Sequence, residues 1–204
     1  MSDLVVTQLR ALTPLEMIAV ITAVGYLVLA IRRNIWCWLF AVVSTASYIA
    51  LCLRAKLYME SVLNLFYLAM AFYGWYAWRT AGDRESKLPV IRWPLLIHLR
   101  AIAAIAAGAA CLGLLLDRFS DAAFPYADSA TAIAAIWTTF LVARKVLENW
   151  WYWLAIDTAS IYLYWARDLQ LTALLFALYV ALIPIGLVAW RRAYAEQQHG
   201  TAAA

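Results

Sequence analysis

A cluster of aromatic, amide and carboxylate residues in the second half of the chain has the chemistry of a small-molecule binding site. Residues 148–157 read Glu-Asn-Trp-Trp-Tyr-Trp-Leu-Ala-Ile-Asp. Side chains three and four residues apart share one face of a helix. One such face carries Trp150, Trp153, Asp157, Ser160 and Tyr164. A face of this kind stacks flat rings, accepts hydrogen bonds and balances a positive charge.

Asp157 is the member of this cluster that packing explains least. It lies near the middle of an apolar segment, where a carboxylate costs roughly 2.5–3.5 kcal/mol on membrane-insertion scales. We therefore expect its side chain to face a cavity or a partner helix rather than lipid. The alternative to a binding role is a structural hydrogen bond to another helix.

A second polar and aromatic face lies earlier in the chain. Glu60, Asn64 and Tyr67 follow one another at helical spacing, and Trp38 and Tyr48 in the preceding apolar segment extend the lining. The alternative for Glu60 is a position at the water–membrane interface. The alternative for the aromatic residues is that they only pack against other helices. Together the two faces predict a pocket for a flat, cationic or hydroxyl-rich solute, since a cation over an aromatic ring gains about 0.5–2 kcal/mol.

The elements that position these residues are predicted to be membrane-spanning helices. Of the 204 residues, 67% are apolar and 14% are charged, and the apolar residues form long blocks. A helix needs about 20 such residues to cross a bilayer, and blocks of this length exclude barrel strands. The sequence predicts an all-α membrane protein with seven spans at 14–31, 35–53, 57–78, 93–116, 129–147, 150–166 and 169–190.

Two groups of three spans resemble one another. Residues 18–80 and 133–192 align with an offset that drifts from 115 to 112. The matched pairs are Asn34 with Asn149, Trp38 with Trp153, Leu39 with Leu154, Tyr67 with Tyr179, Gly74 with Gly186 and Trp78 with Trp190. Because one span separates the groups, both enter the membrane in the same orientation. This predicts two parallel three-helix repeats joined by a linker helix, a 3+1+3 arrangement with the substrate site between the repeats.

The repeats set the expected domain boundaries. We expect a first repeat at 14–80, a connector at 81–128 that contains the span 93–116, a second repeat at 129–192 and a cytoplasmic tail at 193–204. Asp128 and Ser129 are expected to cap the helix that starts the second repeat. The connector helix, rich in alanine, is expected to pack closely against its neighbours.

Basic residues and tryptophans predict the orientation. With the N-terminus outside, ten basic residues fall on the inner side and five on the outer side, counted without Arg100. The positive-inside rule then places the C-terminus in the cytoplasm of a multi-pass inner-membrane protein. Most tryptophans lie near the inner ends and are interpreted as an interfacial belt: Trp36, Trp38, Trp75, Trp78, Trp93, Trp150, Trp151, Trp153 and Trp190.

Several functions lack the residues they need. The sequence has no Walker A loop, no Gly-rich dinucleotide turn and no His/Cys cluster, so we expect no cofactor and no bound metal. Basic residues are scattered between the spans rather than gathered in a patch, which argues against a nucleic-acid partner. A membrane-embedded enzyme is the competing class, but no span holds the paired acid and base groups it would use. Facilitated diffusion is the simplest mechanism, with proton coupling through Asp157 as the alternative.

Three motifs resemble the PnuC family of vitamin transporters, whose best-known members carry nicotinamide riboside. They are Leu57-Tyr58 leading into residues 73–78, Phe124-Pro125 with Asp128-Ser129, and residues 143–150 ending at Trp153 and Asp157. The resemblance implies a fold related to the SWEET proteins, a homotrimer in membrane lipid, and facilitated diffusion. It also implies that a cytoplasmic kinase traps the substrate for NAD biosynthesis, and that substrate contacts come from Asn64, Trp150, Trp153 and Asp157.

Two positions depart from the pattern of the nicotinamide riboside carriers. Those proteins often have glutamine at the position of Asn64 and asparagine at the position of Asp157. We predict nicotinamide riboside as the substrate. Thiamine or another vitamin is the alternative, because thiamine also carries a fixed positive charge. A substrate-binding subunit of an energised complex is a further alternative.

Overall fold

Seven α-helices make up the described part of the chain, which in this computed structural model is residues 12–54, 58–80 and 88–202. They are α2 (Pro14–Ile31), α3 (Cys37–Arg54), α4 (Tyr58–Thr80), α5 (Leu95–Phe119), α6 (Pro125–Ala143), α7 (Asn149–Trp165) and α8 (Gln170–Ala202). Each predicted span overlaps one of these helices, so the all-α class is confirmed.

Five of these helices, α2, α3, α5, α6 and α8, are long and apolar enough to cross a membrane, judged by length and composition. The other two carry the residues singled out from the sequence. α7 has 17 residues and holds Asp157, and α4 holds Asn64. Polar residues lower the mean hydropathy of a helix, and inside a membrane protein they mark functional positions.

The start of α6 corrects one prediction. Pro125 occupies the first turn and Phe124 is the N-cap residue, because proline lacks an N–H and its fixed φ suits the first helical position. The prediction that Asp128 and Ser129 cap this helix is therefore wrong. Asp128 instead pairs with Arg167 in the α7–α8 turn, and the Ser129 hydroxyl donates to the Pro125 carbonyl at 2.7 Å.

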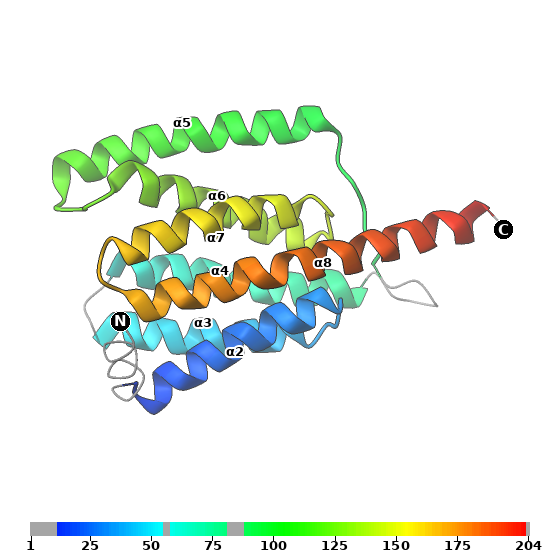
Figure 1. The fold of residues 1–204 in the computed structure, drawn as a ribbon, viewed down its shortest axis with the longest axis horizontal. Coiled ribbons are helices and arrows are strands. Elements are labelled where there is room, and N and C mark those ends of the chain that lie inside the picture. Colours follow the sequence, from blue (N-terminus) through cyan, green and yellow to red (C-terminus); the bar gives the residue numbers. More distant parts are fainter. Residues whose placement is uncertain (1–11, 55–57, 81–87, 203–204) are drawn as a thin grey trace.

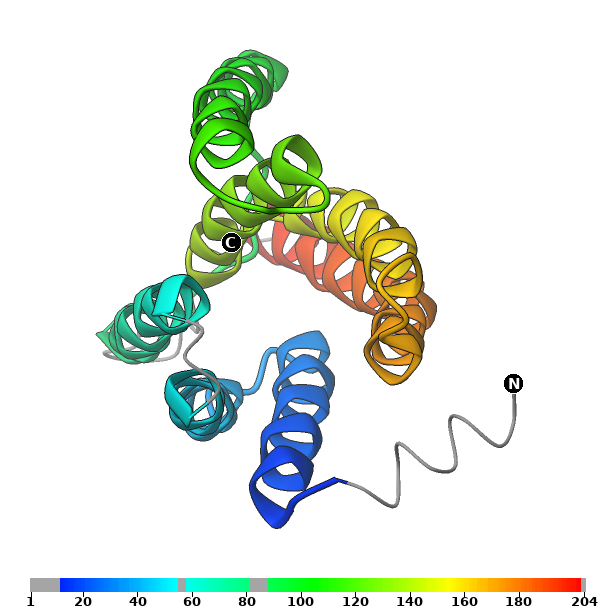
Figure 2. The same cartoon turned by 90° about the vertical axis from the view of Figure 1, so that its left-hand side faces the viewer.

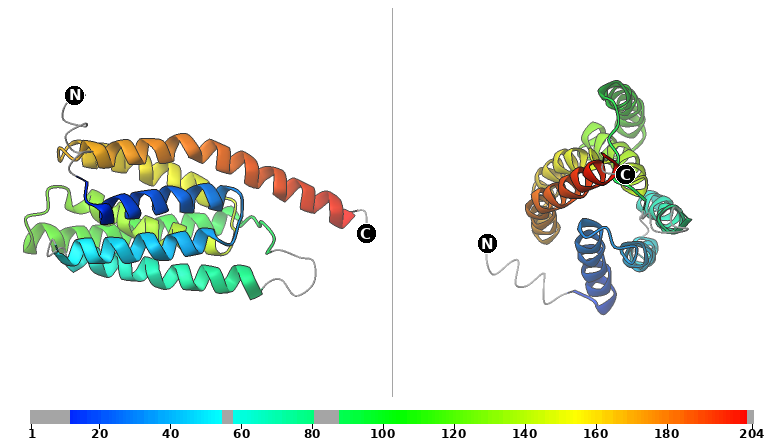
Figure 3. Two further views of the ribbon diagram at one scale, coloured as in Figure 1. Left: turned by 90° about the horizontal axis from the view of Figure 1, so that it is seen from below. Right: turned by 90° about the vertical axis from the view of Figure 1, so that its right-hand side faces the viewer.

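α8 is longer than the span predicted for it. Its 33 residues continue past Trp190 as far as Ala202, so most of the segment expected as a tail is helical. At 1.5 Å per residue the helix is about 50 Å long, which exceeds the roughly 30 Å hydrocarbon layer. Its C-terminal end projects beyond the other helices (Figure 3).

The helices form two groups of three. α3 packs between α2 and α4, and α7 packs between α6 and α8. The groups meet where α4 contacts α6 and where α2 contacts α8. α5 packs along α6 at the edge of the bundle (Figure 2), and its His98 also contacts Tyr152 on α7. Figure 1 shows that α2 and α6, the first helices of the two groups, run in the same direction.

A reciprocal pair of hydrogen bonds joins the groups at one end. The Trp78 indole Nε1 on α4 donates to the carbonyl of Ala143, the last residue of α6, at 3.1 Å. The Trp190 indole Nε1 on α8 donates to the carbonyl of Ala30, in the last turn of α2, at 3.0 Å. The last four carbonyls of a helix have no partner in the regular helical pattern. Each group therefore supplies a donor to a helix end of the other.

Each of these indoles packs edge-on against a tryptophan of the preceding helix. The Trp38 and Trp78 rings are 5.4 Å apart at 86°, and the Trp150 and Trp190 rings are 5.5 Å apart at 88°. All four are at most 7% exposed. The interpretation of these four as an interfacial belt is wrong, because their rings fill the core. Trp36, at 54% exposed, suits the interface.

Two glycines make room for the rings of Trp38 and Trp150. A Cβ atom at Gly74 would lie 2.3 Å from the Trp38 ring, and one at Gly186 would lie 2.3 Å from the Trp150 ring. These contacts relate Trp38 to Trp150, at an offset of 112 residues. The sequence alignment matched Trp38 to Trp153 instead, because several tryptophans in that segment fit equally well by residue type.

Replacing Trp190 with phenylalanine tests the cross-group bond. Trp190→Phe keeps an aromatic ring but removes the N–H that reaches Ala30, so we expect a loss of about 1–2 kcal/mol of stability. The measurement is the thermal unfolding midpoint of the detergent-solubilised protein. Trp36→Phe, at an exposed site, is the control. An unchanged midpoint for Trp190→Phe would show that the bond contributes nothing to stability.

Candidate functional site

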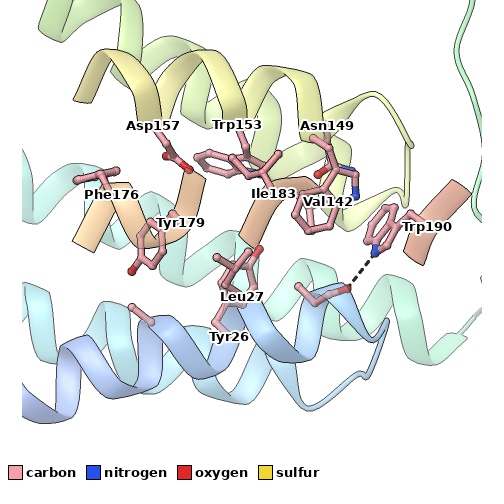
Figure 4. A pocket seen from close by; sticks show the side chains of 13 residues that line it. Tyr26, Leu27, Val142, Asn149, Trp153, Asp157, Phe176, Tyr179, Ile183 and Trp190 are labelled. Carbon is pink, nitrogen blue, oxygen red and sulfur yellow. Dashed lines mark hydrogen bonds between the residues drawn. The ribbon is translucent and has the colours of Figure 1, made fainter. Parts of the chain in front are cut away.

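A cavity of about 150 Å³ lies between α2 of the first group and α7 and α8 of the second. Its walls are mostly apolar and aromatic (Figure 4). The lining residues are Ala23, Tyr26, Leu27 and Ala30 from α2, Val142 from α6, Asn149, Trp150, Trp153 and Asp157 from α7, and Phe176, Tyr179, Ile183 and Trp190 from α8. The cavity thus lies where the two groups of helices meet, beside the Trp190–Ala30 bond.

Three of the residues predicted from the sequence line this cavity together. Trp150, Trp153 and Asp157 face it from α7, as their three- and four-residue spacing predicts. Asp157 is 4% exposed, and Figure 4 shows its carboxylate next to Trp153 and opposite α8. A buried carboxylate among aromatic rings is a site for a cation or a hydrogen-bond donor.

The other predicted residues lie around the cavity rather than in its wall. Tyr164 stacks on the wall residue Phe176, with ring centres 5.3 Å apart at 12°. Tyr48 and Tyr67 lie close enough to Tyr164 to interact with it electrostatically. Tyr164 therefore lies next to the wall of the cavity at Phe176.

The remaining predicted residues have different surroundings. Trp38 packs against the wall residue Tyr26, with ring centres 5.9 Å apart, and so supports the wall from behind. Ser160 is buried on α7, and Asn64 is half-buried on α4, both outside the lining. Glu60 belongs to α4, but its side chain lies outside the described residues.

Several lining residues were not predicted. In the sequence, Asn149 was noted in the cluster at 148–157, in the family motif and as the match of Asn34, but not as a binding residue. Trp190 was noted as the match of Trp78 and as a member of the interfacial belt, and Tyr179 only as the match of Tyr67. Phe176 and Tyr26 carried no signal, because an aromatic residue within an apolar helix fits packing equally well. For Tyr26, only the tertiary contact of α2 with α8 brings it to the cavity.

The segment of residues 88–94, here called the strap, fixes the end of α7 that enters the cavity. The Ile91 N–H donates to the Lys145 carbonyl at 3.1 Å, and the Leu147 N–H donates to the Ile91 carbonyl at 2.8 Å. The ammonium group of Lys145 donates to the Leu88 carbonyl at 3.0 Å and lies 4.3 Å from the Trp78 ring centre. The strap therefore binds the turn between α6 and α7 through backbone hydrogen bonds and through the Lys145 side chain.

Charged groups extend this anchor. The Glu148 carboxylate accepts from Arg92 Nε at 2.8 Å and from the Trp93 N–H at 3.3 Å. The hydrogen bond that Arg92 donates to this carboxylate raises the pKa of Arg92. His98 on α5 contacts the Tyr152 hydroxyl at 3.1 Å. Glu148 directly precedes Asn149, so these contacts position the first residue of α7.

The residues of the cavity wall can recognise a small solute. Within the described residues, no three His, Cys, Asp or Glu side chains are placed to hold a metal ion. One carboxylate, one amide and several aromatic rings recognise a solute by charge, hydrogen bonding and stacking.

Comparison with known families agrees with this description. The family model described as a nicotinamide mononucleotide transporter matches residues 13–192. The chain belongs to this family, the PnuC family of vitamin transporters. It is thus a multi-pass membrane transporter, and the resemblance noted in its sequence motifs is confirmed.

The relatives of this chain include carriers named for different vitamins. The chain is 24% identical over 176 residues to the nicotinamide riboside transporter PnuC of Escherichia coli (strain K12), covering 74% of this chain and 73% of that protein. It is 25% identical over 178 residues to the riboflavin/roseoflavin transporter RibM of Streptomyces davaonensis, covering 86% and 83%. The two sequence identities differ by one percentage point.

A solved PnuC structure has the same fold. The crystal structure of the vitamin B3 transporter PnuC superposes with a TM-score of 0.72 at 22% identity, covering 89% of this chain and 82% of that one. The helical arrangement described above is therefore that of a known transporter.

A matched pair of glycine substitutions tests whether the Trp150 ring belongs to the binding site. Gly186→Ala forces the Trp150 ring toward the cavity, so we expect the affinity for the transported vitamin to fall about tenfold. Gly74→Ala displaces Trp38, which does not line the cavity, and should weaken binding less. Calorimetric titration measures both. Equal losses in the two variants would show that the Trp150 ring has no special role in binding.

Proposed function

We propose that this protein imports nicotinamide riboside by facilitated diffusion. The observation that carries the proposal is the buried Asp157 carboxylate beside Trp153 in a cavity between two groups of helices. Nicotinamide riboside has a flat, positively charged ring and a hydroxyl-rich sugar. The ring matches the carboxylate and the aromatic walls, and the sugar matches hydrogen-bonding groups. The name of the Escherichia coli relative supports the same substrate.

Riboflavin is the second candidate, because the RibM relative is similar to this chain over most of its length. Riboflavin also has a flat ring and hydroxyl groups, but it carries no positive charge. Asp157 therefore favours nicotinamide riboside. Thiamine, which carries a positive charge, fits the carboxylate as well and remains in the comparison below.

The size of the cavity supports a mechanism with moving walls. A volume of about 150 Å³ is below the roughly 300–1,000 Å³ of typical ligand pockets. A riboside is accommodated when α2 moves away from α7 and α8. Closure at one end and opening at the other then moves the substrate across the membrane. Phosphorylation by a cytoplasmic kinase prevents its return.

The wider arrangement is part of the proposal. We infer two parallel three-helix repeats, α2–α4 and α6–α8, with α5 as the linker helix. The common direction of α2 and α6 and the reciprocal indole bonds support this inference. We also infer that the N-terminus is outside and the C-terminus cytoplasmic, as the basic residues indicate, and that the protein is a homotrimer.

The proposed substrate site has an inner set and an outer set of residues. Trp150, Trp153 and Asp157 contact the substrate from the cavity wall. The outer set completes the site when α2 moves, and comprises Trp38, Tyr48, Glu60, Asn64, Tyr67, Ser160 and Tyr164.

Calorimetric titration of the purified protein with nicotinamide riboside, riboflavin and thiamine tests the substrate. Uptake into liposomes without any energy source tests the mechanism. Binding of nicotinamide riboside alone, with uptake that stops at equal concentrations, supports the proposal. Binding of only riboflavin or thiamine would reassign the substrate, and uptake that requires a proton gradient would replace facilitated diffusion by coupled transport.

Asp157→Asn tests the charge match. Removal of the carboxylate should weaken binding of cationic nicotinamide riboside by about tenfold or more, because a charge pair at 4 Å is worth roughly 4 kcal/mol at an effective dielectric of 20. Asp168→Asn removes the same charge from an exposed turn and should leave the affinity unchanged. If Asp157→Asn binds the cation as tightly as the unaltered protein, Asp157 is not a substrate contact.

A further inference from the structure

The side-chain amide of Asn149 is a fully buried polar group with one half of its hydrogen bonding unused. Its Nδ2 donates to the Val146 carbonyl at 2.6 Å. In the part of the chain that the structure describes, no donor lies within hydrogen-bonding distance of its Oδ1. Asn149 is 0% exposed and lines the cavity. A buried acceptor without a donor is unfavourable, so this oxygen is suited to a donor that enters the cavity.

The strap fixes which way this amide faces. The carbonyl of Val146 and the N–H of Leu147 belong to one peptide unit. That N–H donates to the Ile91 carbonyl of the strap at 2.8 Å, while the carbonyl accepts from Asn149. Because the Val146 carbonyl can only accept a hydrogen bond, the Asn149 side chain turns its Nδ2, not its Oδ1, toward Val146. Rotating the amide by 180° would set two oxygens against each other, which leaves Oδ1 toward the cavity.

The turn itself does not require an amide at this position. The turn at 32–36 in the first group has the same backbone form, with left-handed Arg33 (φ 55°) matching Lys145 (φ 50°). In each turn the N–H of the first helical residue, Cys37 or Asn149, donates to the carbonyl three residues earlier, at 3.0 and 3.2 Å. The first turn therefore forms with a thiol where the second has an amide. Only the second of these two side chains lines the cavity.

We propose that Asn149 binds the substrate through Oδ1, accepting a hydrogen bond from an N–H or O–H group, and that the strap positions it for this contact. This inference rests on the proposed function as a vitamin importer. Asn149 and Asp157 are eight residues apart on α7, about 12 Å along the helix axis, with Trp153 between them (Figure 4). The substrate thus lies along α7, with a donor group at Asn149 and its positive charge at Asp157.

Two substitutions separate the acceptor role from a structural one. Asn149→Cys installs the residue that the first turn already accommodates, and it removes both the donor and the acceptor of the amide. Asn149→Asp keeps an acceptor oxygen but removes the Nδ2 donor to Val146. Calorimetric titration with nicotinamide riboside should show binding weakened by about tenfold to a hundredfold in Asn149→Cys and by less than about threefold in Asn149→Asp. Cys37→Ala is the matched control in the first turn and should bind normally.

Two results would overturn the proposal. If both Asn149 variants lose affinity equally, the Nδ2 bond to the turn is what matters, and the role of Asn149 is structural. If neither variant loses affinity, the oxygen does not contact the substrate. Unfolding midpoints of all variants show whether a loss of affinity follows from loss of the fold.

The unaltered protein decides the proposed function separately. If it binds riboflavin instead of nicotinamide riboside, the same variants are titrated with riboflavin, whose imide N–H and hydroxyl groups are also donors. If it binds neither, the proposed function fails and the Asn149 contact fails with it. Binding by the unaltered protein together with unaffected variants overturns the Asn149 contact alone.

Discussion

Two indole–carbonyl hydrogen bonds hold the two halves of this protein in register. The carbonyls at the ends of α2 and α6 lie where a regular helix offers no donor, and lipid offers none either. Trp78 supplies a donor to the Ala143 carbonyl, and Trp190 adds a second donor to the Ala30 carbonyl, which also accepts from the Arg33 N–H at 2.9 Å. The cavity lies between α2 and α8, beside the Trp190 bond that joins these two helices. The glycines at 74 and 186 follow from the same constraint, since they admit the rings that pack on the two donors.

The halves share a framework but not a site. At an offset of 112 residues, Cys37, Ala41 and Thr45 on α3 take the places that Asn149, Trp153 and Asp157 occupy on α7. The Thr45 hydroxyl is used within its own helix, where it donates to the Ala41 carbonyl at 2.8 Å. The backbone turn and the buried tryptophans are thus common to both halves, while the cavity chemistry belongs to the second. The strap is a second difference between the halves, because it binds the turn between α6 and α7 in the second half.

The sequence predicts the parts of this structure that depend on local pattern. Apolar blocks predict the helices, and helical spacing predicts that Trp150, Trp153 and Asp157 share a face, because both rules concern residues near one another in the chain. Tyr26 could not be found in this way, since its place in the wall depends on how α2 meets α8. The four core tryptophans were misread for a related reason: a ring near a helix end suits the membrane interface or a buried contact equally well. The cap expected at Asp128 failed because Pro125 starts the helix one turn earlier.

The narrowness of the cavity has a thermodynamic consequence. If the substrate enters only after the wall of α2 has separated from α8, binding and separation form one linked equilibrium. The measured dissociation constant is then the intrinsic constant divided by the fraction of molecules in the open form. Residues that never touch the substrate, such as those that stabilise the closed packing of α2 on α8, therefore set affinity as directly as the residues of the wall. Under this mechanism a tighter closed form lowers apparent affinity, so stability and substrate capture oppose each other.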